Sequence, residues 1–126
     1  MSPTVLKFAS PPADSEGVWT EERCFIVETW NHPSDSGVSL ARARVPPGAK
    51  TAKHCLAVDE RYLIEKGRGR VEVEGIETEV RPGDVVLIPR GATQRIRNPG
   101  DEDLVFLCVC TPRFEPRHYE DREAET

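Results

Sequence analysis

The stretch GAKTAKHCLAVDERYLIEKG, residues 48–67, sets the architecture of this chain. A second stretch, GDVVLIPRGATQRIRN at residues 83–98, has the same build, with strand-forming residues between turn-forming glycine and proline. Only 15 residues separate the two stretches, which leaves room for one β-hairpin and nothing larger. Together they predict antiparallel β-strands joined by tight turns.

Strand parity indicates which side chains of the first stretch lie together. Successive side chains of a β-strand point to opposite faces, so His54 and Leu56 share one face. After a bend, Glu60 and Tyr62 share a face as well. The first stretch therefore gathers a histidine, a carboxylate, a phenol and an aliphatic group on strand faces that can meet inside a barrel.

The spacing of the first stretch resembles one of the two sequence motifs of the cupin family. That motif has a glycine, a His-x-His pair, a glutamate and a closing glycine, and its slots fall on Gly48, His54, Leu56, Glu60 and Gly67. Leucine therefore stands where the motif has its second histidine.

The second stretch resembles the other cupin motif. The slots for its glycine, its Pro-x-Gly, its histidine and its asparagine fall on Gly83, Pro89, Gly91, Gln94 and Asn98. Glutamine replaces the histidine. The glycine and proline frame is thus complete, whereas two of the four usual metal ligands have changed chemistry.

The resemblance covers residues 38–110 and implies an all-β, single-domain cupin barrel, also called a double-stranded β-helix or jelly roll. A chain of 126 residues fits one domain with one core. We expect an N-terminal arm at residues 1–22, the barrel at 23–112, and a C-terminal extension with an acidic tail at 113–126.

The remaining strands follow from residue type. β-branched and aromatic runs predict strands over 24–30, 38–45 and 104–110, and a hairpin over 70–80. The apolar run at residues 85–89 predicts a buried strand.

The resemblance implies a divalent metal ion, Mn, Fe, Ni or Zn, held by His54, Glu60 and Gln94. Imidazole nitrogen and carboxylate oxygen are common ligands of such ions, and an amide oxygen is a weaker, neutral one. Leu56 cannot coordinate. The alternative is that the metal has been lost and that the three polar residues form a hydrogen-bonded cluster.

Two functions remain open at this point. In the first, the chain is a metalloenzyme that acts on a small oxygen-rich carboxylate or diketone as a dioxygenase, decarboxylase or isomerase. Glu60 and Tyr62 would then be catalytic. In the second, it is a barrel that binds a sugar or metabolite without catalysis.

We expect the substrate pocket to involve Arg42, Leu56, Ile96 and Cys108. Residues 38–45 alternate strictly, so Arg42 lies either inside the barrel, where its guanidinium could hold a carboxylate, or on the solvated face, with the small residues inside. Cys108 either lines the interior or fills the core as a small hydrophobe.

Composition limits the classes of binding partner that we expect. The net charge of -5 and the pI near 5.2 leave no basic footprint for nucleic acid or an anionic membrane. No apolar run approaches the roughly 20 residues of a membrane span, and no secretion signal is evident. We therefore expect a cytoplasmic protein with four free thiols and a small-molecule ligand.

We also expect a homodimer, because an exposed edge strand needs protection. The strand at residues 24–30, with Trp19 nearby, could pair with a second copy. Alternatively, Trp19 and Trp30 cover the barrel of a monomer.

Overall fold

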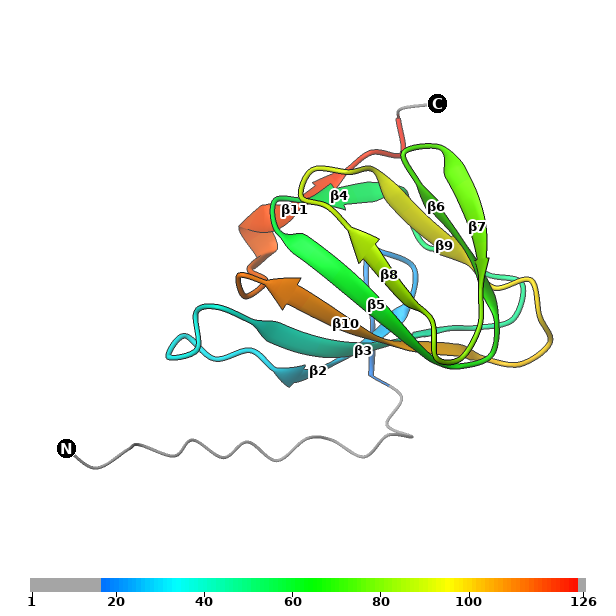
Figure 1. Ribbon diagram of the computed structural model, residues 1–126, viewed down its shortest axis with the longest axis horizontal. Coiled ribbons are helices and arrows are strands. Elements are labelled where there is room, and N and C mark those ends of the chain that lie inside the picture. Colours follow the sequence, from blue (N-terminus) through cyan, green and yellow to red (C-terminus); the bar gives the residue numbers. More distant parts are fainter. Residues whose placement is uncertain (1–16, 125–126) are drawn as a thin grey trace.

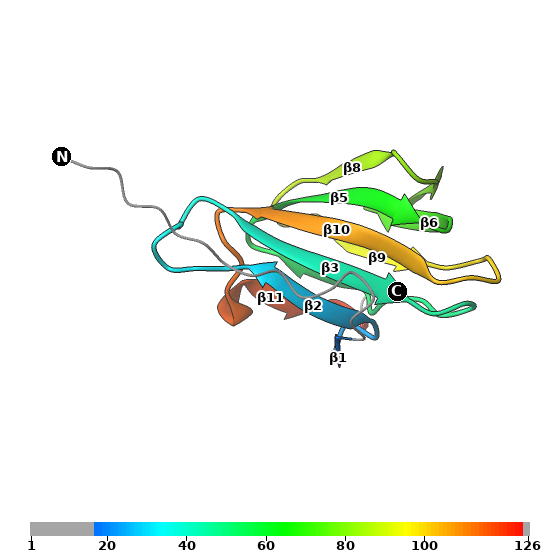
Figure 2. The ribbon, with the colours of Figure 1, turned by 90° about the horizontal axis from the view of Figure 1, so that it is seen from below.

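The computed structural model describes residues 17–124 as two antiparallel β-sheets that face each other (Figure 1). The first sheet has six strands in the order β1-β2-β3-β10-β5-β8. Their bounds are Val18–Trp19, Phe25–Trp30, Ser39–Val45, Leu104–Thr111, Asp59–Lys66 and Val85–Ile88, in that order. Figure 2 shows five of them, β2, β3, β10, β5 and β8, running side by side as one layer.

The second sheet has five strands in the order β11-β4-β9-β6-β7. Their bounds are Tyr119–Asp121, His54–Leu56, Gln94–Arg97, Gly69–Val73 and Ile76–Val80. A single 3-10 turn, η1 (Pro116–His118), precedes β11. This two-sheet arrangement confirms the predicted single-domain jelly-roll barrel. Within residues 17–124, no helix is both long enough and apolar enough to cross a membrane.

The core lies between the sheets because the strands alternate. Strand β10 shows it most clearly: Leu104, Phe106, Cys108 and Cys110 are buried, and the residues between them are only partly so. Since β10 pairs with β3 on one side and β5 on the other, its inward side chains form the middle of the interior surface.

The glycine that closes the first motif is required by packing. Gly67 has φ +76°, and a Cβ atom there would lie 2.5 Å from the carbonyl oxygen of Asp103. Only glycine allows this turn and this close approach of the loop before β10.

Strand β8 corrects one expectation. Residues 85–89 were predicted to be a buried strand, but β8 is an edge strand in which Val85 and Leu87 are 64% and 56% exposed. Only Ile88 is fully buried, with Val86 partly so. The apolar run has one inward and one outward face, because an antiparallel sheet packs against the core with one face only.

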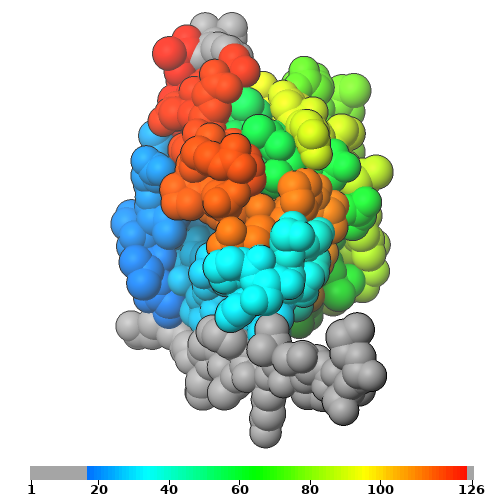
Figure 3. All heavy atoms as spheres, turned by 90° about the vertical axis from the view of Figure 1, so that its left-hand side faces the viewer, coloured from blue at the N-terminus to red at the C-terminus, as the bar shows by residue number. Residues whose placement is uncertain are grey.

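The segments before and after the barrel motifs pack against the barrel. Strand β11 pairs with β4, and β1 extends the first sheet beyond β2. Figure 3 shows the C-terminal segment, in orange and red, beside the N-terminal strands in blue. Residues 1–16 of the predicted arm and residues 125–126 of the predicted tail lie outside the described residues.

Candidate functional site

Glu60 lies at the centre of the site, inside the barrel. It follows the turn into β5, where strand parity turns it inward next to Cys110 of β10, and Cys110 in turn faces Ser39 of β3. Glu60 is 6% exposed. The Cys110 thiol donates to Glu60 Oε2 at 3.7 Å, whereas Glu60 Oε1 is buried without a hydrogen-bond partner.

The surroundings of Glu60 favour its protonated form. Burial raises the pKa of Glu60 to about 8, and repulsion from Glu22 acts in the same direction. The side chains of Gln94, Cys110 and Cys108 partly offset this rise in pKa. The Gln94 side chain lowers the pKa of Glu60, although its amide nitrogen, Nε2, has no partner within hydrogen-bond distance.

His54 is buried, and its orientation is set by backbone and ring contacts. Its Nδ1 lies 2.7 Å from the carbonyl oxygen of Ala52, which can only accept, so Nδ1 carries a proton. The ring stacks on Tyr119 of β11 at 5.2 Å. Its Nε2 lies 3.9 Å from Glu22 Oε2. His54 therefore presents Nε2 toward a carboxyl group from the N-terminal segment.

Gln94 faces His54 across the β4/β9 pair, but its carbonyl oxygen is already engaged. The Tyr62 hydroxyl donates to Gln94 Oε1 at 2.5 Å. The amide nitrogen is the end of the side chain that remains unpaired. Gln94 therefore offers the site an N–H donor, which suits a carboxyl group and cannot ligate a cation.

A partly open pocket of about 140 Å³ lies next to Glu60. Its polar wall is formed by Thr20, Glu22, Glu28, Ser39 and Glu60. Its apolar wall includes Ile26, Leu40, Ala41, Leu56, Cys108, Cys110 and Phe114. The pocket exists because the inward face of β3 carries small side chains such as Ser39 and Ala41, which leave space that larger residues would fill.

The predicted metal ligands do not fit a metal ion well. His54 and Glu60 keep a free nitrogen and a free oxygen, but Gln94 directs its acceptor to Tyr62. In the described part of the chain, no group of three or more His, Cys, Asp or Glu side chains is placed to hold a metal ion. The hydrogen bonds of these three residues go to other groups: His54 to the Ala52 carbonyl, Gln94 to Tyr62, and Glu60 to the Cys110 thiol.

The predicted pocket residues divide into two groups. Leu56 and Cys108 line the pocket. Arg42 does not: it lies on the outer face of the first sheet and donates to Glu65 Oε1 at 3.0 Å, so its assignment to the pocket is wrong. The small residues of β3 occupy the interior because burying an arginine without a partner is costly.

Two more predicted residues lie behind the pocket. Ile96 has no exposed surface and packs in the main core cluster, so the pocket assignment made for it is also wrong. Tyr62, predicted to be catalytic, is 4% exposed, packs on Phe106 and holds Gln94. It supports the pocket from the core side.

Sequence reasoning missed Glu22, Glu28 and Phe114. Glu22 falls in the segment predicted to be an arm, and Phe114 in the extension. The sequence could have indicated Glu28, because side chains along β2 point alternately to opposite faces, which places Ile26 and Glu28 on one face. No such indication exists in the sequence for Glu22 and Phe114, because contacts made by segments outside the barrel motifs follow no repeating sequence pattern.

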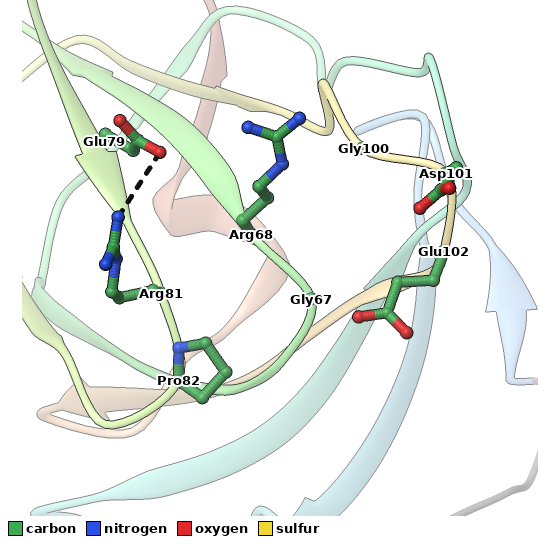
Figure 4. A pocket seen from close by; sticks show the side chains of 8 residues that line it. All are labelled: Gly67, Arg68, Glu79, Arg81, Pro82, Gly100, Asp101 and Glu102. Carbon is green, nitrogen blue, oxygen red and sulfur yellow. Dashed lines mark ion pairs between the residues drawn. The ribbon is translucent and has the colours of Figure 1, made fainter.

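A second hollow, of about 360 Å³, lies among the loops around Gly67 and Gly100. Figure 4 shows Arg81 turned toward Glu79, with which it forms an ion pair at 3.7 Å, and Arg68 on the neighbouring segment. None of the predicted site residues lines it. The pocket beside Glu60 is therefore the candidate functional site.

Comparison with known proteins places this geometry in context. The family model described as "Cupin domain" matches residues 41–110. An uncharacterized protein of Methanocaldococcus jannaschii is 38% identical over 86 residues, which cover 68% of this chain and 66% of that protein. An oxalate-binding protein of Thermotoga maritima is 34% identical over 71 residues, which cover 56% of this chain and 59% of that protein. The match thus spans less than two thirds of each relative's length.

A solved structure extends the similarity beyond the motifs. A cupin 2 conserved barrel domain protein from Salinispora arenicola superposes with a TM-score of 0.72. The superposition covers 90% of this chain and 93% of that chain, at 19% sequence identity. At this identity the likeness concerns the fold alone.

Proposed function

Since the chain belongs to the cupin family, we propose that its barrel binds a small organic molecule in the pocket beside Glu60, without a resident metal ion. The observation that carries this proposal is the buried, unpaired Glu60 Oε1 at the wall of a pocket. A buried carboxyl oxygen without a donor is costly, and a ligand that donates to it removes this cost.

The walls of the pocket support a binding role. Concave sites that combine apolar surface with a few convergent polar groups are typical of small-molecule binding. Here Leu56 and Phe114 provide apolar surface, and Glu60 provides the convergent polar group. The Thermotoga maritima relative is an oxalate-binding protein, which is consistent with ligand capture in such a barrel.

The second candidate is the metalloenzyme expected from the cupin motifs. One observation favours it: the Ala52 carbonyl holds the His54 tautomer that leaves Nε2 free, as a metal ligand requires. His54 and Glu60 would then hold a divalent ion with solvent or Glu22. The ion would supply a positive charge that polarises a bound oxygen.

Elemental analysis separates the two candidates. We expect protein purified without an affinity tag, then incubated with Mn, Fe, Ni or Zn and desalted, to retain far less than one ion per chain. A stoichiometric ion that is lost in His54→Ala would contradict the metal-free proposal and establish the second candidate.

A thermal-shift screen of small molecules tests binding itself. We expect ligands that raise the melting temperature of the wild type and fail to do so in Ala41→Leu, because the added side chain fills the pocket. Arg42→Leu, on the outward face of the same strand, is the matched control and should keep the shift. Ligands that stabilise Ala41→Leu equally would show that binding takes place elsewhere.

A further inference from the structure

The pocket beside Glu60 carries three carboxyl groups at increasing depth. Glu28 on β2 is exposed, the Glu22 side chain is 25% exposed, and Glu60 is 6% exposed. Of the described residues that line this pocket, none is arginine or lysine. Graded charge of one sign in a low-dielectric cleft concentrates ligands of the opposite sign.

The deepest of these groups has an unmet hydrogen-bonding need. Glu60 Oε1 has no partner within hydrogen-bond distance, and Glu60 Oε2 accepts from the Cys110 thiol, a weak donor, at 3.7 Å. Once ionised, Glu60 only accepts, and a positive charge beside it favours ionisation, so a charged donor is the group that completes this site. Charged donors form the strongest hydrogen bonds with carboxylates.

The size and the walls of the pocket limit the rest of the ligand. A volume of about 140 Å³ is below the roughly 300–1,000 Å³ that is typical of sites for drug-sized ligands. Leu56 and Phe114 make the opposing surface apolar. The space therefore suits a short carbon chain attached to one charged donor group.

We propose that the pocket binds a small alkylammonium compound, whose ammonium group donates to Glu60 Oε1 and whose carbon chain packs against Leu56 and Phe114. This inference rests on the proposed binding function and names its ligand class. An anion such as a carboxylate or a phosphate would face Glu22 and Glu28, and Glu60 once it is ionised, and no arginine or lysine among the described lining residues would balance them, which disfavours it.

Three probes of matched size test the ligand class by calorimetry: propylammonium, propionate and 1-propanol, at pH 8.5 and low salt. At this pH Glu60, with a pKa of about 8, is largely ionised, and an alkylamine with a pKa near ~10.4 remains protonated. We expect propylammonium to bind at least about tenfold more tightly than either other probe.

Variants connect this preference to the pocket. Glu60→Gln should weaken propylammonium binding about tenfold or more, since it removes the charge and keeps the shape. Glu28→Gln, at the exposed rim, should cause a smaller loss. Glu65→Gln, on the outward face of β5, is the matched control and should bind as the wild type does. Circular dichroism confirms that each variant is folded.

Each contrary result has a distinct meaning. Equal or tighter binding of propionate or 1-propanol, or propylammonium binding that survives Glu60→Gln, overturns the ammonium proposal. If the thermal-shift screen still yields ligands that Ala41→Leu excludes, the proposed binding function stands without it. If neither the three probes nor the screen yields such a ligand, both proposals fail. Stoichiometric Zn²⁺ or Mn²⁺ that Glu60→Gln abolishes would identify a metal ion as the occupant instead.

Discussion

Asn98 shows that a motif residue can serve the barrel's architecture and not its chemistry. Its side chain is 1% exposed and donates from Nδ2 to the carbonyl oxygens of Val45 and Glu102 at 2.9 and 2.7 Å. Its Oδ1 accepts from the amide of Gly100 at 2.9 Å. One side chain thus ties the end of β3 to the loop before β10.

Asn98→Ala should therefore lower the free energy of unfolding by about 2–4 kcal/mol, because one buried and two partly buried hydrogen bonds to the backbone are lost at once. Urea denaturation followed by circular dichroism measures this change. Ser34→Ala, at an exposed loop position, is the control and should change stability by less than about 0.5 kcal/mol. A loss below about 1 kcal/mol in Asn98→Ala would mean that water replaces these hydrogen bonds.

The raised pKa of Glu60 predicts how the free energy of unfolding depends on pH. Below the pKa of an unfolded glutamate, about 4.3, the side chain is protonated in both states. Between that value and about 8, its pKa in the folded protein, the unfolded chain releases the proton and the folded one keeps it. The free energy of unfolding therefore falls as pH rises through this window.

Glu60→Gln should flatten this pH dependence and should be more stable than the wild type at pH 8, since glutamine does not titrate. Chemical denaturation at pH 5, 6.5 and 8 measures the free energy of unfolding of both proteins. Glu65→Gln should retain the slope of the wild type. Identical slopes for Glu60→Gln and the wild type would show that Glu60 has an ordinary pKa in the folded protein.

Strand β8 exposes apolar side chains where a sheet ends. Val85 and Leu87 face outward, and Ile76 at the start of β7 is 72% exposed. A groove of about 610 Å³ runs between β7 and β8, each of which pairs with a neighbour on one side only in the described sheets. Exposed apolar edges of this kind favour association.

The double variant Val85→Lys/Leu87→Lys should therefore reduce self-association with little effect on stability, because both side chains already face solvent. Sedimentation velocity over a range of concentrations measures it. Val86→Lys is the parity control, since Val86 packs against the core and its replacement should destabilise the fold. Unchanged association in the double variant would direct attention to the strand at Phe25–Trp30, the dimer contact expected from the sequence.

The barrel motifs and the flanking segments form one structure. The pocket receives Thr20 and Glu22 from before β2 and Phe114 from after β10, so its wall needs both segments in place. The segment after β10 is also joined to the loop after β2, because Asn31 Nδ2 donates to the carbonyl oxygen of Phe114 at 2.8 Å. We therefore expect the flanking segments to unfold together with the barrel.

Tryptophan fluorescence and far-ultraviolet circular dichroism should report a single, coincident unfolding transition. Trp19 and Trp30 lie in β1 and β2, so their fluorescence follows the N-terminal strands, whereas circular dichroism follows both sheets. A fluorescence change at lower denaturant concentration than the loss of ellipticity would mean that the N-terminal strands form a separate unit.

The local signals of the sequence were enough for the fold, because turns and strand alternation depend on near neighbours. The spacing of Gly48, Gly67 and Gly83 indicated the barrel, and parity turned Glu60 inward. Strand parity alone could not show which face of β3 points into the barrel. Arg42 was therefore expected in the pocket, whereas Ser39 and Ala41 line it.

The chemistry of the site was decided only when distant segments met. Glu22 and Phe114 reach the pocket from outside the motifs, and the Tyr62 hydroxyl occupies the Gln94 oxygen that the sequence offered as a ligand. Local pattern determines which residues form strands and which way they face. The side chains that share a buried space, and hence their charge and hydrogen bonds, depend on contacts between residues far apart in the chain, and no period in the sequence records these.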